Sequence, residues 1–477
     1  MVEGFFSISH LVKTVWKGAT AMPKYENDLF ENCPVLKAIL RLAIPTVIGQ
    51  IILVVYNMAD TFFIGLTGSD AKLTAATVCM PAFMFLSAIS NLFGVGGASV
   101  ISRAMGGGKH SRLKKASAFA FWGCVLLTLM YSLSVYLARD VFIDLLGGKA
   151  HEVHVFAREY LTITVVFGGL VTAMSTLLSH LIRSEGHSLE SSIGITLGGV
   201  LNILLDPLFM FVLLRPGQEI IGAALATLLS NCFSLVFFIV YYIRNSTALS
   251  FRPSWGMLDQ SVMLDVLGSG LPACLMTLFE NVSYAVLDNL MAAYGIACQA
   301  GLGVAKKINM LAHSIVRGMS QGVLPLIGFS YAAKNYRRMK QSILYSGAIS
   351  VAVALLCMAA NFVFSEPLVS IFIADENIQS ISEGARFLRI LCLGCPFSAC
   401  AYAIISFFQA TGKGMKSFSL AIMRKGILDI PMMFLLNGVI AIYGIVIATP
   451  IADVLCSIAA IILFLTFLKQ HREIERA

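Results

Sequence analysis

The residues of this 477-residue chain best suited to chemistry are acidic side chains within long apolar runs. Asp60 and Asp206 are the plainest cases, because an ionisable group in such a run by default marks an ion or substrate path. Asn202 lies one helical turn before Asp206, so both side chains share a helix face, and Thr227 lies at a similar depth in the next run. We therefore predict that a hard monovalent cation, sodium if the protein is sodium-coupled, binds to Asp60, Asn202, Asp206 and Thr227. Alternatively, the two carboxylates share a proton. The alternative is that Asp60 caps a helix end and Asp206 pairs with a neighbouring asparagine.

A second set of polar residues is expected to contact a transported substrate. Glu280 lies near the middle of an apolar run, and Asp288 follows eight residues later on about the same helix face. A carboxylate at this depth would attract a cationic substrate or exchange a proton with it. The other interpretation is a salt bridge from Glu280 to a basic residue of the next run, namely Lys306, Lys307 or Arg317. The residues predicted to bind substrate are Glu280, Asp288, Asn57, Tyr284 and Met276.

Composition indicates that these residues belong to a membrane protein. The chain is 58% hydrophobic and only 13% charged, with a mean hydropathy of +0.83. A soluble protein has about 25% charged residues. Apolar windows long enough to cross a bilayer recur about twelve times, which predicts an all-α integral membrane protein. The predicted spans are 37–66, 71–97, 116–139, 155–182, 188–214, 219–243, 263–294, 298–327, 341–365, 384–410, 415–441 and 443–468.

The chain also repeats itself, with landmarks that recur about 225 residues apart. The recurring pairs are Pro45 and Pro272, Pro207 and Pro431, and segments 222–227 and 444–449. Two such halves in a membrane chain usually enclose a substrate pathway. The predicted organisation is a cytoplasmic leader 1–36, an N-lobe of six helices 37–243, a cytoplasmic linker 244–262, and a C-lobe of six helices with a short tail 263–477.

Three prolines are expected to bend the helices that contain them, because proline cannot donate a backbone hydrogen bond. They are Pro45, Pro207 and Pro431. Pro207 also leaves the carbonyl oxygen of Ile203 free for a cation or a water molecule.

Basic residues gather on alternate loops, so one side of the membrane collects most of the lysine and arginine. Examples are the clusters around Lys109 and Arg112 and around Lys334 and Arg337. The positive-inside rule then predicts that both termini are cytoplasmic. We expect a multi-pass protein of the plasma (inner) membrane. The net charge of +8 reflects this topology and does not argue for nucleic-acid binding.

Several motifs resemble those of the multidrug and toxic compound extrusion (MATE) family, and the resemblance covers nearly all of the chain. The motifs are Pro45 with Asn57-Met58-Ala59-Asp60-Thr61, Arg183 with Gly186, Asn202-Ile-Leu-Leu-Asp206-Pro207, and Gln321-Gly322-Val-Leu-Pro325 followed by Ala333-Lys334-Asn335-Tyr336. The last run is the most distinctive, and it is similar to the bacterial drug-efflux branch.

The resemblance implies two six-helix bundles that face each other across a V-shaped cleft and are related by a pseudo-two-fold axis along the membrane normal. It also implies antiport by alternating access, in which sodium ions or protons enter while an organic, often cationic, compound leaves. The four cation-site residues named above match the first-lobe cation site of the family. Glu280 matches an acid of the branch whose site is in the second lobe, but that branch also has an aspartate on helix 10. Segment 386–411 contains no acidic residue, so the first lobe is favoured for coupling.

Other functions stay open. A flippase for a lipid-linked or amphiphilic metabolite, on a related two-lobe fold, would favour basic residues in the central cavity, whereas the expected cavity charges are mostly acidic. An enzyme is not expected, since the sequence has no His-rich metal spacing, Ser-His-Asp pattern or phosphate-binding glycine loop. We predict no cofactor besides the coupling ion. The expected partners are membrane lipid and small organic, cationic substrates, with no nucleic acid, and the chain is expected to act as a monomer.

Overall fold

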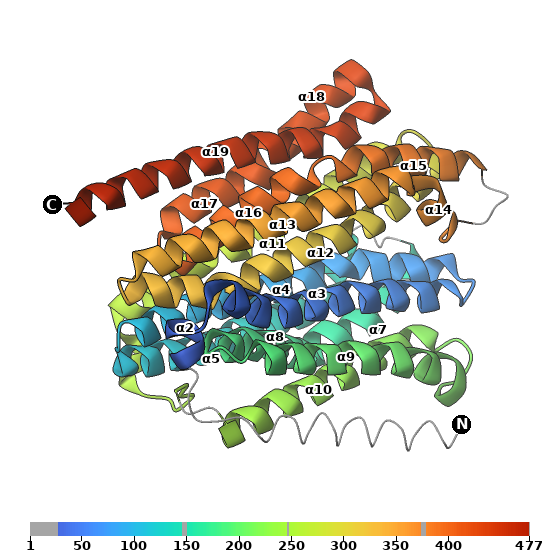
Figure 1. The fold of residues 1–477 in the computed structure, drawn as a ribbon. Coiled ribbons are helices and arrows are strands. Elements are labelled where there is room, and N and C mark those ends of the chain that lie inside the picture. The colour runs from blue at the N-terminus through green and yellow to red at the C-terminus, as the bar shows by residue number, and fades with distance from the viewer. Residues whose placement is uncertain (1–26, 146–149, 246–247, 374–377, 477) are drawn as a thin grey trace, which may run out of the picture.

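The computed structural model describes residues 27–145, 150–245, 248–373 and 378–476, and every regular element within them is helical (Figure 1). The first half contains α2 (Asn27–Glu31), α3 (Val35–Gly65), α4 (Asp70–Gly106), α5 (His110–Leu137), α6 (Arg139–Leu145), α7 (His151–Leu161), η1 (Thr162–Phe167), α8 (Gly169–Ser184), α9 (Ser188–Leu208), η2 (Phe209–Leu213) and α10 (Glu219–Asn245). The second half contains η3 (Trp255–Leu258), α11 (Gln260–Ala292), α12 (Ile296–Ala332), α13 (Tyr336–Val363), α14 (Ser365–Ser370), α15 (Ile378–Cys392), α16 (Cys395–Ala410), α17 (Gly414–Ile422), η4 (Met423–Asp429), α18 (Ile430–Ile440) and α19 (Ile442–Arg476). Of the predicted leader, 1–36, residues 1–26 lie outside the described residues.

The long helices are apolar enough to cross a membrane. Eight helices among the described residues pass this test by length and composition, and ten spans result when each of two bent helix pairs is taken as one span. α3, for example, has 31 residues and so extends about 46 Å, more than the roughly 30 Å of a hydrocarbon core. The bent pairs are α7–η1 with α8, at 48°, and α15 with α16, at 42°. The predicted all-α membrane fold is therefore confirmed.

Two of the twelve predicted spans are not among these ten. Segment 298–327 corresponds to α12, and segment 415–441 corresponds to α17, η4 and α18. Both contain basic side chains, such as Arg317 and Lys425, which lower their hydropathy. α12 nevertheless packs along α3, α13 and α15 as part of the bundle.

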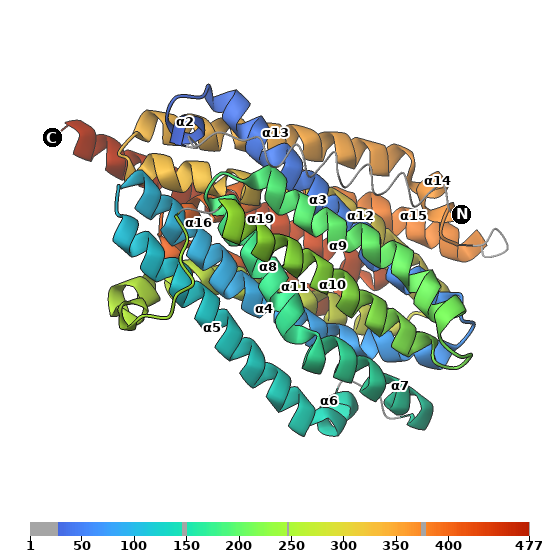
Figure 2. The same cartoon turned by 90° about the horizontal axis from the view of Figure 1, so that it is seen from below.

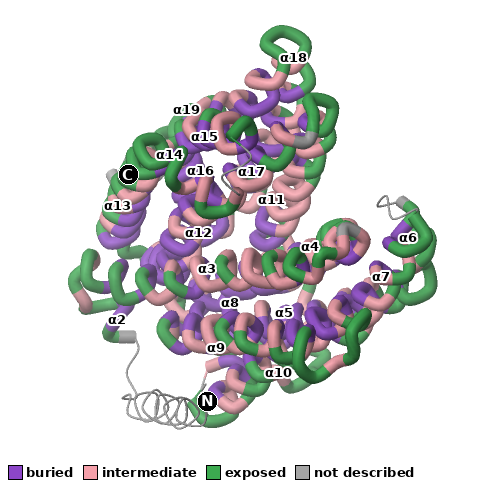
Figure 3. The backbone as a smooth tube through the Cα atoms, turned by 90° about the vertical axis from the view of Figure 1, so that its right-hand side faces the viewer, coloured by how far each residue is buried: buried purple, intermediate pink, exposed green. Residues whose placement is uncertain are grey.

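The helices of each half form a group of their own, and successive long helices run antiparallel (Figures 1 and 3). In the first half α9 packs against α3 and α10, while α4 packs against α5 and α8. Figure 2 shows α8, α9 and α10 side by side on the face of this half that is turned away from the second half. In the second half α12 packs against α13 and α15, and α16 packs against α13 and α19. The two halves meet where α4 lies against α11 and α3 lies against α12.

Glycines allow these helices of opposite halves to approach closely. A Cβ atom on Gly270 of α11 would collide with the carbonyl oxygen of Leu92 on α4, and one on Gly96 would lie 3.1 Å from the Cα atom of Gly270. Between α12 and α3, a Cβ atom on Gly322 would lie 2.8 Å from the Cα atom of Ala43. These close approaches lie toward the end of the molecule at which α3 and α11 begin.

Polar contacts join the halves at the same end. Arg112 of α5 forms an ion pair with Asp265 of α11. The Ser99 hydroxyl of α4 donates a hydrogen bond to the carbonyl oxygen of Gln409 of α16, at 2.5 Å. Together with the glycine contacts, these interactions hold the two halves together at the end where α3 begins.

The three prolines expected to bend helices have different local structures. α3 is one continuous helix across Pro45. Pro207 lies at the end of α9 just before the π-helical η2, and Pro431 follows the π-helical η4. The two bent spans described above have their breaks elsewhere, at 168 and 393–394. Bending at the three prolines stays a prediction, whereas the two breaks were not expected from the sequence.

Candidate functional site

Three of the predicted cation-site residues are joined by hydrogen bonds. The Asn202 side-chain nitrogen of α9 donates to Asp206 Oδ1 at 3.2 Å and to Thr227 Oγ1 of α10 at 3.3 Å. The residues are buried, with exposed fractions of 1% for Asn202, 0% for Asp206 and 7% for Thr227. One amide therefore links two neighbouring helices inside the first half.

Asp60 of α3 completes this group. α3 packs against α9, and Asp60 lies near enough to Asp206 for their charges to interact. The side chain of Tyr160, which is buried on α7, lies near the Asp60 carboxyl group. Sequence reasoning missed Tyr160, because α7 carries no other predicted site residue and spacing alone does not relate it to Asp60. The structure thus brings all four predicted residues together and adds a tyrosine.

Three oxygen atoms in this group have no hydrogen-bond partner among the described residues. They are Asp60 Oδ1, Asn202 Oδ1 and Asp206 Oδ2, all inaccessible to solvent. A buried acceptor without a partner costs about 1–3 kcal/mol. The arrangement is therefore suited to a positively charged occupant, either a cation between the oxygens or a proton on a carboxyl group. The donor set of two carboxylates, an amide oxygen and a hydroxyl fits a sodium ion.

The alternative interpretation of these aspartates is correct only in part. Asp206 does pair with a neighbouring asparagine, Asn202, but its second carboxylate oxygen stays without a partner. Asp60 lies five residues before the last residue of α3, Gly65, where a carboxylate is not the favoured charge for a helix end. Pairing and capping alone therefore leave the three unpaired oxygens unexplained.

The predicted substrate residues of the second half are engaged in ion pairs. Arg317 Nη2 of α12 lies 2.7 Å from Glu280 Oε2, and the Tyr402 hydroxyl lies 3.4 Å from the other carboxylate oxygen. Lys306 forms an ion pair with Asp288. The salt bridge considered for Glu280 is therefore present, with Arg317 as its partner. A substrate role for Glu280 and Asp288 stays a prediction, in which a cationic compound has to compete with these two basic residues.

The remaining predicted substrate residues are Tyr284, Met276 and Asn57, and each has a different kind of contact. The Tyr284 ring lies near two ammonium groups, those of Lys306 and Lys425, at 5.4 and 5.8 Å from its centroid. Met276 is partly buried against the apolar core. Asn57 of α3 donates to the carbonyl oxygen of Leu53, at 2.6 Å.

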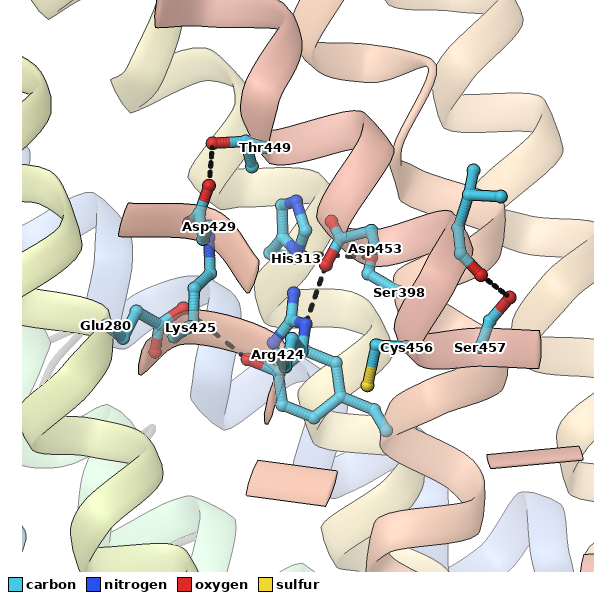
Figure 4. A network of polar contacts seen from close by, with 12 residues as sticks. Glu280, His313, Ser398, Arg424, Lys425, Asp429, Thr449, Asp453, Cys456 and Ser457 are labelled. Carbon is cyan, nitrogen blue, oxygen red and sulfur yellow. Dashed lines mark hydrogen bonds and ion pairs between the residues drawn. The ribbon is translucent and has the colours of Figure 1, made fainter. Parts of the chain in front are cut away.

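A further polar network in the second half was not among the predicted site residues (Figure 4). Arg424 of η4 lies 2.7 Å from Asp453 of α19, and each side chain is only 1% exposed. The next residue, Lys425, lies 2.6 Å from Asp429 Oδ2. Asp429 Oδ1 accepts a hydrogen bond from Thr449 at 2.9 Å. These contacts neutralise both acids from within the chain.

Comparison with known proteins identifies the family. The MatE family model matches residues 45–208 and again residues 272–435. The two matches begin 227 residues apart, which confirms the internal repeat expected from the sequence.

Similar proteins of known name agree with this match. The chain is 30% identical over 435 residues to the multidrug export protein MepA of Staphylococcus aureus (strain MSSA476), covering 91% of this chain and 94% of that protein. It is 28% identical over 448 residues to the protein of the same name from Staphylococcus saprophyticus subsp. saprophyticus, covering 94% of this chain and 97% of that protein. A solved structure described as an outward-facing multidrug resistance MATE family transporter of the MOP superfamily superposes with a TM-score of 0.85 at 24% identity, covering 96% of this chain and 100% of that chain. The chain therefore belongs to the MatE family, whose members are membrane transporters and not enzymes.

Proposed function

We propose that this protein is a secondary active antiporter that exports organic, often cationic, compounds in exchange for sodium ions or protons. The observation that carries the proposal is that the first half has three buried oxygens without a hydrogen-bond partner, from Asp60, Asn202 and Asp206. The site has no basic side chain among its four predicted residues, so a cation or a proton has to balance its charge. The relatives named above are multidrug export proteins, which supports drug-like compounds as substrates.

The exchange proceeds by alternating access. The halves are joined at the end where α3 begins, which the positive-inside rule assigns to the cytoplasm. In this state a cation enters from outside and binds between Asp60 and Asp206, which draws α3, α9 and α10 together. The resulting change in the bend of α3 at Pro45 alters the surface of the first half that the substrate contacts. The substrate then binds more weakly. A cation can drive this cycle only through its different affinity for the outward-open and inward-open states.

The flippase alternative gains no support from the basic residues of the second half. Lys306, Arg317, Arg424 and Lys425 each form an ion pair with a carboxylate of the same half. They are therefore not free to hold a diphosphate group, as a lipid-linked saccharide would require.

The test is transport of a fluorescent cationic dye into inside-out proteoliposomes, with a sodium gradient and a pH gradient imposed in turn. We expect one of the two gradients to stimulate dye uptake by the unmodified protein. Asp60→Asn and Asp206→Asn should each reduce the stimulated rate at least about tenfold, because either change removes a charged ligand of the cation. Asp140→Asn, at an acid of α6 that is 56% exposed, is the matched control and should transport normally.

Two results would contradict the proposal. Dye uptake that responds to neither gradient would exclude coupled antiport of that dye and would favour the flippase. Normal, gradient-driven uptake by both Asp60→Asn and Asp206→Asn would show that coupling uses other residues.

A further inference from the structure

The second half contains a counterpart of the cation site. The two sets of residues lie about 223 residues apart in the repeat, at corresponding places on corresponding helices. η4 and α19 are in contact in the second half, as α9 and α10 are in the first. The set in the first half is Asn202, Asp206 and Thr227, and its counterpart is Lys425, Asp429 and Thr449.

The aspartate of the counterpart has partners that Asp206 lacks. Thr449 donates to Asp429 Oδ1 at 2.9 Å, and Ser283 of α11 donates to Oδ2 at 2.7 Å. The Lys425 ammonium lies 2.6 Å from the same Oδ2 atom. Both carboxylate oxygens of Asp429 are therefore satisfied, whereas Oδ2 of Asp206 has no partner.

The charge of the two sites differs as well. At the 227-residue spacing of the family matches, the counterpart of Asp60 is Leu287, which lines a small pocket together with Lys425 and Thr449. The first site thus contains two acids and no base, while the second contains one acid and one base. Asp429 and Lys425 are 0% and 4% exposed, so this compensation is made in a buried environment where an unpaired charge is costly.

We propose that Lys425 is a built-in cation: its ammonium group occupies, in the second half, the place that the exchanged ion takes in the first half. The ammonium is attached to η4 by its own side chain and cannot leave, so this site does not respond to an ion gradient. The doubled chain then has one exchangeable cation site, and its two halves differ in role: the first responds to the ion and the second keeps a fixed charge. This inference rests on the proposed cation site of the first half.

The test is to remove the tethered cation and to ask whether a free cation replaces it. Lys425→Asn restores the asparagine of the first half. It is best made in the Asp206→Asn background, where the first site has lost one of its two acids and, by the proposed function, its binding of the coupling ion. Thermal unfolding of the full chain in detergent is then followed at increasing sodium concentration, at constant ionic strength, and separately at decreasing pH. In Asp206→Asn/Lys425→Asn we expect the midpoint temperature of unfolding to rise with sodium concentration or with decreasing pH. In Asp206→Asn alone we expect it to respond to neither.

Two further variants identify the charge as the cause. Asp206→Asn/Lys425→Arg keeps a tethered cation and should be insensitive, like Asp206→Asn. Asp206→Asn/Lys425→Asn/Asp429→Asn has neither charge and should also be insensitive. Comparison of the unmodified protein with Asp206→Asn tests the first-half site separately, so failure of that site is distinguishable from failure of this inference.

Each outcome decides the matter. A folded Lys425→Asn variant whose stability is independent of sodium and of pH would overturn the inference. If Lys425→Asn yields folded protein only at high sodium or low pH, or only when Asp429→Asn is added, the inference is supported. If the variant lacking both charges also fails to fold, Lys425 acts through packing and the inference is wrong.

Discussion

The side-chain nitrogen of Asn202 lies 3.2 Å from Oδ1 of Asp206, and this contact fixes which way the amide faces. The same nitrogen also reaches the Thr227 hydroxyl, so both of its hydrogens are used within the first half. The amide oxygen is then left without a partner, as is the second carboxylate oxygen of Asp206. In the proposed site the oxygen of Asn202 is therefore the atom available to an ion, because Asp206 and Thr227 accept hydrogen bonds from its nitrogen.

Loss of the Thr227 hydroxyl is expected to loosen this arrangement. In Thr227→Val one amide hydrogen of Asn202 loses its acceptor, which costs about 1 kcal/mol, and the apparent affinity for the coupling ion should fall about fivefold. Thr227→Ser keeps the hydroxyl and should behave like the unmodified protein. The measurement is dye uptake against ion concentration in proteoliposomes. Equal ion dependence for Val and Ser at this position would show that the hydroxyl has no role.

The buried ion pair of Arg424 with Asp453 is expected to matter for stability. Arg424→Met leaves Asp453 charged and buried, and we expect a loss of about 3–5 kcal/mol. Arg424→Met/Asp453→Asn removes both charges and should recover most of that loss. The measurement is thermal unfolding in detergent, with Arg386→Met, at a residue 55% exposed, as the control. A double variant no more stable than Arg424→Met would contradict the explanation by charge.

The contact between α4 and α11 is expected to control which end of the transporter is open. Gly270→Ala places a Cβ atom against the backbone of Leu92, so the two halves should separate at this end. Gly268→Ala is the matched control, because a Cβ atom at Gly268 has no heavy atom within 4 Å. Spin labels on α5 and α13 near the joined end should report longer distances in Gly270→Ala and unchanged distances in Gly268→Ala. Identical distance distributions in the two variants would exclude this role for the glycine contact.

The ion pair of Glu280 with Arg317 leads to a prediction about substrate. If the carboxylate attracts a cationic compound, Arg317→Met removes its competitor, and the dye should bind about tenfold more tightly. Glu280→Gln should weaken binding of the same dye. The measurement is dye fluorescence polarisation with purified protein. Binding that is unchanged in both variants would assign the pair a structural role only.

Particular residues show how far the sequence leads. Apolar runs such as that of α3 predicted the helices correctly, because a bilayer requires long apolar segments whose backbone is satisfied internally. α12 was also predicted as a span, although Arg317 and its neighbouring lysines lower its hydropathy. The breaks at 168 and 393–394 could not be predicted in this way, since hydropathy does not record the direction of a helix axis.

In the candidate site, too, some relations between residues follow from the sequence and others only from the packing of helices. The i,i+4 spacing of Asn202 and Asp206 placed both on one helix face, since that relation is local to a single helix. The proximity of Asp60 to Tyr160, and the pairing of Glu280 with Arg317, depend on how separate helices are rotated and packed.

The sequence by itself therefore determined the membrane class, the doubled organisation, the family and the four oxygen-bearing residues of the first half. These follow from composition and from spacing along the chain, which are fixed before any helix packs. Only the tertiary structure decided which carboxylates are left unpaired and which are neutralised by the chain's own basic residues. The physical reason is that the state of a buried charge depends on its nearest partner in space. Asp206 and Asp429 occupy corresponding places in the repeat, but Asp429 is paired with Lys425 whereas one oxygen of Asp206 has no partner.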